Sequence, residues 1–216
     1  MKILFCLSVW IIGCSVAINE YTVAVTELPQ RKTKLTQEEI KSLDSVDVHF
    51  HLRGGCYAYS SNKNAIASNG EAHSNNTAQA VDGTFPREGF YLIINRNELI
   101  KIDGGKLGCK LYLVNTSDSL VNLSASDSRL YIVAEALNED NIWQPITYLQ
   151  SSWCGNSYHT VALDTNEFWE FDIPVFKGEL KTKVRYTLSL GNKGQIHSNE
   201  IVAFINRDQF DVTKKQ

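Results

Sequence analysis

Residues 158–190, YHTVALDTNEFWEFDIPVFKGELKTKVRYTLSL, contain three apolar runs that decide the fold. The runs are Tyr158 to Leu163, Phe168 to Ile173 and Val184 to Leu190, and polar or turn-forming residues separate them. Each run is rich in aromatic and β-branched residues and has the length of a strand, whereas helical periodicity is absent. The stretch therefore predicts consecutive β-strands.

The same rhythm begins at Cys109 and continues to the end of the chain. Eight apolar runs, separated by Asn, Asp, Ser and Gly, are typical of an antiparallel sandwich. The clearest turns between them are 138–141 and 191–194. The other five runs are Leu111 to Val114, Leu120 to Leu123, Leu130 to Ala136, Trp143 to Leu149 and Ile201 to Ile205.

Upstream of Cys109 the signals are weaker. Gly89 to Ile94 and Leu99 to Ile102 are apolar runs that Asn95 to Asn97 can join as a hairpin. Residues 57–88 are rich in Ser, Asn, Ala and Gly and predict a long loop with little buried surface.

The first strand and one helix are predicted before this loop. From Val46 to Leu52 apolar and polar residues alternate, which is typical of a strand with one buried face. Residues 36–39, Thr-Gln-Glu-Glu, form a capping-box pattern ahead of Ile40 and Leu43 and predict a short helix.

The segment Leu163 to Leu190, in which a polar turn precedes Phe168-Trp169-Glu170-Phe171 and a β-rich return, resembles strand pairs of immunoglobulin-like bacterial accessory domains. The resemblance implies an all-β fold, an antiparallel immunoglobulin-like β-sandwich, over residues 46–210. Residues 15–45 are expected to be a tether with the short helix. The resemblance carries no active-site motif.

The amino terminus carries a targeting signal. Lys2 precedes an uncharged apolar stretch, Ile3 to Ile12, which is too short to span a bilayer. Ile11-Ile12-Gly13-Cys14 resembles the lipobox of bacterial lipoproteins. The resemblance implies that residues 1–14 are a signal peptide and that Cys14 becomes the lipid-modified first mature residue.

The location follows from this signal. Ser15 after Cys14 resembles the signal for transport to the outer membrane, so we expect a bacterial envelope protein held in a membrane by its lipid. The alternative is cleavage after Ser15-Val16-Ala17, which would release a soluble periplasmic or secreted protein beginning at Ile18.

Charge argues against a nucleic-acid partner. The chain of 216 residues has a formal net charge of −3, and its charges are interspersed. A nucleic-acid groove would need a basic stripe. The one basic cluster is Arg31-Lys32-Thr33-Lys34, next to the proposed anchor.

Three cysteines follow the signal peptide: Cys56, Cys109 and Cys154. An odd number in an oxidising compartment indicates one disulfide and one free thiol. Three chain reversals between Cys109 and Cys154 would bring them to one end of the domain, so these two are predicted to pair. The alternative is three free cysteines that serve as small apolar side chains.

Two residue sets could carry chemistry. Asp47, His49 and His51 share one face of the first predicted strand and could ligate a metal, although a solvated polar face explains the alternation equally well. Residues 153–157, Trp-Cys-Gly-Asn-Ser, superficially resemble a thioredoxin active site, and Cys154 with His159 could form a nucleophile and base.

Neither catalytic set is complete, so the sequence favours a non-enzymatic binding or structural module without a cofactor. The loops 57–88 and 150–157 would form its contact surface, with Trp153 and Tyr158 as candidate residues for a protein or glycan partner. The alternative is a periplasmic metal-binding or thiol-dependent protein, and a sandwich that inhibits a proteinase also remains compatible.

Overall fold

The computed structural model describes residues 35–60, 74–82, 85, 88–152 and 154–215. Cys14, the signal peptide and the alternative cleavage site lie outside these residues. The helices are α1 (Gln37–Ser42) and four short 3₁₀ turns, η1 (Asp103–Gly105), η2 (Gly155–Ser157), η3 (Gly191–Lys193) and η4 (Arg207–Phe210). The strands are β1 (Leu52–Arg53), β2 (Gln79–Ala80), β3 (Phe90–Ile102), β4 (Lys106–Asn115), β5 (Val121–Ser126), β6 (Arg129–Leu130), β7 (Ile132–Leu137), β8 (Trp143–Pro145), β9 (Thr147–Tyr148), β10 (Tyr158–Leu163), β11 (Glu167–Pro174), β12 (Leu180–Ser189), β13 (Gln195–His197) and β14 (Ile201–Ile205).

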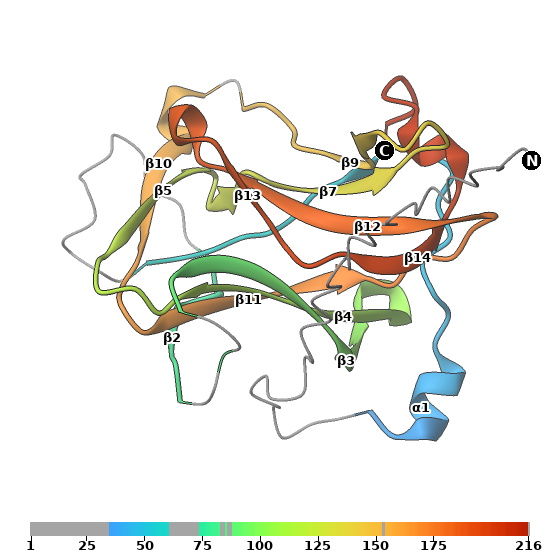
Figure 1. Ribbon diagram of the computed structural model, residues 1–216, viewed down its shortest axis with the longest axis horizontal. Coiled ribbons are helices and arrows are strands. Elements are labelled where there is room, and N and C mark those ends of the chain that lie inside the picture. The colour runs from blue at the N-terminus through green and yellow to red at the C-terminus, as the bar shows by residue number, and fades with distance from the viewer. Residues whose placement is uncertain (1–34, 61–73, 83–84, 86–87, 153, 216) are drawn as a thin grey trace, which may run out of the picture.

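Two large antiparallel sheets form the layers of the molecule (Figure 1). One has the strand order β2-β11-β4-β3, and the other has the order β13-β12-β7-β8 with β14 also paired to β12. Their inner faces share one apolar core. The predicted all-β sandwich with a short amino-terminal helix is therefore confirmed, and the likeness to immunoglobulin-like domains stays a prediction.

The core forms because alternate residues of each strand point inward. Leu111 and Leu113 of β4 meet this core from one sheet, and Leu188 of β12 meets it from the other. The other face of β4 is also apolar: Tyr112 and Val114 belong to a smaller cluster on the outside of the four-stranded sheet. The other members of that cluster are Phe85, Tyr91, Ile93 and Phe168.

A third sheet, of order β10-β5-β6, lies at one end of the sandwich (Figure 1). Strand β5 pairs with β10 along its whole length, from Val121 opposite Leu163 to Ser126 opposite Tyr158. Strand β6 is much shorter and pairs with β5 only at Ala125 and Ser126. This end is therefore the least complete part of the fold.

The predicted hairpin at residues 89–102 is wrong, because β3 continues through Asn95 to Asn97 as one strand with a bulge. The side chains explain why the chain does not reverse. Asn95 Nδ2 and the Tyr112 hydroxyl both donate to Glu98 Oε2, at 3.2 and 2.5 Å. The reversal comes later, at Gly104 and Gly105, whose positive φ of 69° suits glycine.

The predicted first strand, Val46 to Leu52, is only partly formed. Its regular pairing is confined to β1, which runs parallel to β9, and the earlier residues make isolated bridges. Bends at His49 and Phe50 reverse the alternation, so that His51 is buried.

The predicted helix and the predicted downstream strands agree more closely with the structure. The capping box at Thr36 is present, with Thr36 N donating to Glu39 at 2.7 Å and Glu39 N donating back to Thr36 Oγ1 at 3.2 Å. The eight downstream runs all contain strands, although 130–136 is split into β6 and β7 of different sheets, 143–149 is split into β8 and β9, and β13 was not predicted. The expected loop 57–88 contains more buried apolar side chains than predicted, since Ala58 lies in the main core and Phe85 lies in the smaller cluster.

Gly178 gives a test of the packing between β12 and β14. A Cβ at this position would overlap the backbone carbonyl of Ile205, because the two chain segments approach very closely there. We expect Gly178→Ala to lower the free energy of unfolding by about 1–3 kcal/mol, measured by urea denaturation.

Gly155→Ala is the matched control, because a Cβ at Gly155 would meet open space. It should change stability by less than about 0.5 kcal/mol. Equal stability of the two variants would contradict the close approach at Gly178.

Candidate functional site

Four residues form a continuous row across the third sheet and the segment beside it. Tyr57 bridges to Arg129, Arg129 pairs with Ser126, and Ser126 pairs with Tyr158. Directly paired residues point to the same face of a sheet. Adjacent strands lie about 4.8 Å apart, so three such spacings put the Cα atoms of Tyr57 and Tyr158 within about 15 Å of each other. Tyr57 comes from the predicted contact loop 57–88, and Tyr158 directly follows the other predicted contact loop, 150–157.

Exposure differs sharply along the row. Tyr57 and Tyr158 are 38% and 45% exposed, whereas Ser126 and Arg129 between them are buried. The Arg129 guanidinium donates to the Gln150 carbonyl, so the segment before Trp153 contacts the buried middle of the row. The result is two exposed aromatic rings around a buried cation.

The loop is also fixed at its other end. The Tyr158 hydroxyl donates to the Ser152 carbonyl at 3.0 Å, and Ser152 Oγ donates to Ser157 Oγ at 2.6 Å. The phenol of Tyr158 thus orients its own ring and holds the loop. A partner that contacts Tyr158 would meet a preorganised side chain, which lowers the entropic cost of binding.

Tyr131 adds a third phenol next to this row. Burial raises the pKa of Tyr131, the nearby Tyr158 phenol raises it further, and Arg129 opposes the shift. We call Tyr57, Arg129, Tyr131 and Tyr158 the tyrosine cluster. Tyrosine and arginine are enriched where proteins bind one another most tightly, since each combines apolar surface with a polar group.

The sequence identified only part of the tyrosine cluster. Tyr158 is exposed as expected for a contact residue, and Trp153 lies outside the described residues. Tyr57, Tyr131 and Arg129 were not singled out. Nothing in the sequence shows that Tyr57 pairs with Arg129, because that bridge joins residues 72 positions apart.

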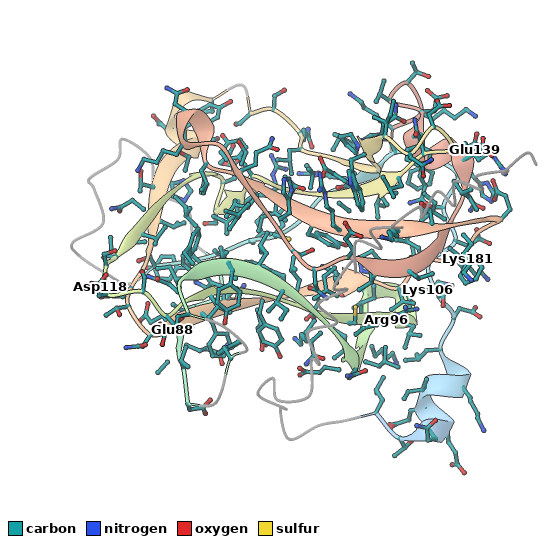
Figure 2. The ribbon with its side chains drawn as sticks, viewed as in Figure 1. Glu88, Arg96, Lys106, Asp118, Glu139 and Lys181 are labelled. Carbon is teal, nitrogen blue, oxygen red and sulfur yellow. The ribbon has the colours of Figure 1, made fainter. Side chains whose placement is uncertain are left out.

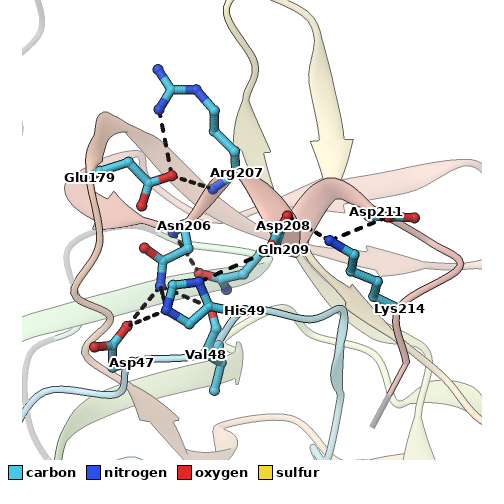
Figure 3. Close-up of polar contacts among 10 residues, drawn as sticks. All are labelled: Asp47, Val48, His49, Glu179, Asn206, Arg207, Asp208, Gln209, Asp211 and Lys214. Atoms are coloured by element: carbon cyan, nitrogen blue, oxygen red, sulfur yellow. Dashed lines mark hydrogen bonds and ion pairs between the residues drawn. The ribbon is translucent and has the colours of Figure 1, made fainter.

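The three proposed metal ligands do not converge. His49 Nε2 lies 3.5 Å from Asp47 Oδ1, and Asn206 donates to that same carboxylate at 2.8 Å (Figure 3). His51 points elsewhere and lies against Tyr148, with ring centroids 5.9 Å apart.

The reason is the pair of bends at His49 and Phe50, which turns His51 away from the face of Asp47. Cations also balance the nearby carboxylates: Lys214 lies 2.9 Å from Asp208, and Lys177 lies 3.9 Å from Asp47 (Figure 3 shows the first pair). Among the described residues, no group of three His, Cys, Asp or Glu side chains could hold a metal ion.

The predicted disulfide between Cys109 and Cys154 is absent, and Cys56, Cys109 and Cys154 are free thiols. Cys109 lies in β4, where it faces Leu99 of β3 and Ile173 of β11 and is buried. Cys154 is exposed ahead of β10 in the third sheet. The prediction failed because β5 leaves the sheet of β4, so the assumed chain reversals do not bring the two residues together.

The proposed pair of Cys154 and His159 is not arranged as a nucleophile and base. His159 is buried and its Nδ1 lies 3.0 Å from the Ser157 carbonyl oxygen, whereas Cys154 is exposed. The residues after Cys154 form a short 3₁₀ turn and then β10, so no α-helix follows the thiol as thioredoxin-type chemistry requires.

Comparisons with known proteins give no match: no protein-family model, curated protein or solved structure is similar to this chain. The helices in the described part of the chain are all too short or too polar to cross a membrane.

The three thiols should differ in reactivity. Burial raises the pKa of both Cys56 and Cys109 to about 12, so both remain protonated and shielded at pH 8. We therefore expect Ellman's reagent to modify Cys154 in the folded protein and to reach Cys56 and Cys109 only in urea, as located by peptide mass spectrometry.

Cys154→Ser is the control and should remove the fast reaction among these three thiols. A non-reduced digest that contained a peptide bridged through Cys109 would contradict the assignment.

Proposed function

We propose that this chain is a lipoprotein of the bacterial cell envelope and that its β-sandwich is a non-enzymatic binding module. The tyrosine cluster is the observation that carries the binding role. It presents two exposed aromatic residues, Tyr57 beside β6 and Tyr158 at the start of β10, with a buried arginine between them and the Tyr158 hydroxyl bonded to the Ser152 carbonyl.

The partner that fits this surface best is a protein. A sugar site needs polar groups free to bond hydroxyls beside the aromatic ring. In this cluster the guanidinium of Arg129 and the hydroxyl of Tyr158 already donate to the loop 150–157. The aromatic rings of Tyr57 and Tyr158 add exposed apolar surface, and aromatic side chains are enriched in protein interfaces.

The alternative of a metal-binding or thiol-dependent protein lacks support from the described residues. Asp47 and His49 face Asn206, while His51 lies against Tyr148. The side chain of His159 is buried and its Nδ1 contacts the Ser157 carbonyl, whereas the thiol of Cys154 is exposed.

The anchor is proposed from the amino-terminal sequence. Lys2, the apolar stretch that follows it and Ile11-Ile12-Gly13-Cys14 together match the order of a lipoprotein signal. More than one acyl chain on Cys14 would give stable attachment, because each buried methylene contributes about 0.8 kcal/mol. Ser15 favours the outer membrane as the destination.

The lipid anchor has a direct test. In a bacterial host, the wild-type chain should partition into the detergent phase of a Triton X-114 extract, and Cys14→Ala should shift it to the aqueous phase because the acylated thiol is lost. Cys6→Ala, within the apolar stretch, is the control and should still partition into detergent. Equal membrane retention of Cys14→Ala would refute the anchor.

The binding surface is tested by photo-crosslinking in the same cells. A benzoylphenylalanine introduced at Tyr57 or Tyr158 should give a discrete adduct with an envelope protein, identified by mass spectrometry. Phe204 is the matched control site, because it is 46% exposed but lies on β14, which belongs to the large sheet of β12. Adducts at Phe204 alone would contradict the site, and a carbohydrate adduct at Tyr57 or Tyr158 would contradict a protein partner.

A further inference from the structure

A groove runs along one edge of β5. It has a volume of about 450 Å³, and it lies between β5 on one side and the end of β12 with the turn after it on the other. Residues 121–124 of β5 line it, together with Thr160 of β10 and Lys193 of the turn after β12.

The backbone of β5 is unpaired along this groove. Strand β6 pairs only with Ala125 and Ser126, and no described residue pairs with the remaining residues, 121–124, on the side away from β10. The groove therefore follows an open strand edge, to which another strand can be added.

The hairpin between β5 and β6 fixes which backbone groups face the groove. Asp127 and Ser128 form a two-residue turn with positive φ, so Ser126 and Arg129 are a hydrogen-bonded pair. Hydrogen-bonding direction alternates along a strand, and Ser124 and Asn122 therefore direct their N–H and C=O groups into the groove. These groups are spaced to bond a peptide strand.

The two faces of the groove differ in polarity. Leu123 lies on the face of β5 that joins the core, together with Ala125. Asn122 and Ser124 lie on the opposite face beside Thr160, their neighbour on β10. A fitting strand would be apolar at every second residue and small and polar at the others.

The chain itself contains a segment with this sequence pattern. Residues 20–27 read Glu-Tyr-Thr-Val-Ala-Val-Thr-Glu, in which Tyr21, Val23 and Val25 alternate with Thr22, Ala24 and Thr26. Aromatic and β-branched residues favour strands. Both expected cleavage sites leave this segment on the mature chain, and its terminal glutamates complement Lys193 in the groove.

A neighbouring molecule is the better donor of this strand. The described chain begins next to α1, which lies at the opposite end of the long axis from β5 and β10 (Figure 1). Asp118, which precedes β5, likewise lies far from the end that carries Lys106 (Figure 2). Only eight residues lie between Thr26 and Leu35, so the chain between these two positions spans at most about 30 Å.

We propose that residues 20–27 of one copy of this chain add as a strand to the open edge of β5, at Val121–Ser124, in a second copy. The donated backbone pairs with Asn122 and Ser124, its tyrosine and valines lie on the Leu123 face, and its threonines lie beside Ser124 and Thr160. The inference does not depend on the lipid anchor or on the tyrosine cluster.

Cross-linking of the full-length chain tests the proposal. Ala24→Cys and Ser124→Cys are made as separate variants in the Cys154→Ser background, mixed, and treated with a short bis-maleimide. A heterodimer linked through positions 24 and 124 is expected, at a yield at least five times that of control mixtures with Thr33→Cys as donor or Glu200→Cys as acceptor. Glu200 is exposed on the loop between β13 and β14.

Two further variants make the test specific. Val23→Pro in the donor should reduce the heterodimer to the control level, since proline removes a backbone donor and disfavours the strand, whereas Thr33→Pro should leave the yield unchanged. The heterodimer should persist with Cys14→Ala, which separates self-association from the anchor.

Three results would overturn the proposal. The first is a heterodimer yield no higher than that of the controls, and the second is a yield that Val23→Pro does not change. The third is an intramolecular link in the Ala24→Cys, Ser124→Cys double variant without a heterodimer in the mixture, because it would show that the strand occupies the groove of its own chain.

Discussion

The apolar interface between the two large sheets is the interaction on which the rest of this structure depends. Strand β4 is the centre of one sheet and is buried on both faces, and its partners β11 and β3 are positioned by it. Each fully buried leucine or isoleucine at this interface contributes about 1.5–3 kcal/mol. The one polar atom of the fully buried Trp169 side chain is satisfied, because Trp169 Nε1 donates to the Tyr59 carbonyl at 3.1 Å.

The features that we propose for binding lie on the smaller third sheet, outside the shared core of the two large sheets. Strand β6 has two residues, and within the described part of the chain nothing else pairs with that edge of β5. The row that joins Tyr57 to Tyr158 crosses the same sheet at its other end. Incomplete pairing, which would be a liability in a core sheet, exposes here both backbone groups and aromatic rings.

The sequence predicts this fold where local periodicity decides the structure. The exact bounds of β10 and β14 and the capping box at Thr36 follow from patterns within a few residues. Prediction from the sequence fails where contacts between residues far apart in the chain determine the structure. The bulge in β3 forms because Asn95 and Tyr112 both bond Glu98, and no local signal separates that bulge from a hairpin turn.

In the candidate site too, local features could be predicted from the sequence, whereas features set by distant contacts could not. The exposure of Tyr158 could be predicted from its turn-rich neighbourhood, but its alignment with Tyr57 requires Arg129 and Ser126 between them. The cysteine pairing failed for a related reason. It assumed that successive strands stay in one sheet, whereas β5 and β10 leave the sheet that contains Cys109.

The proposed strand-addition edge and the tyrosine cluster both include residues of β5. Ser126, the last residue of this strand, pairs with Tyr158, whereas Asn122 and Ser124 line the groove. Because Tyr158 is already held by its hydrogen bond to the Ser152 carbonyl, a strand added at Asn122 and Ser124 has little ordering left to supply at the cluster. The two proposed interactions can therefore be tested separately, although they involve the same strand.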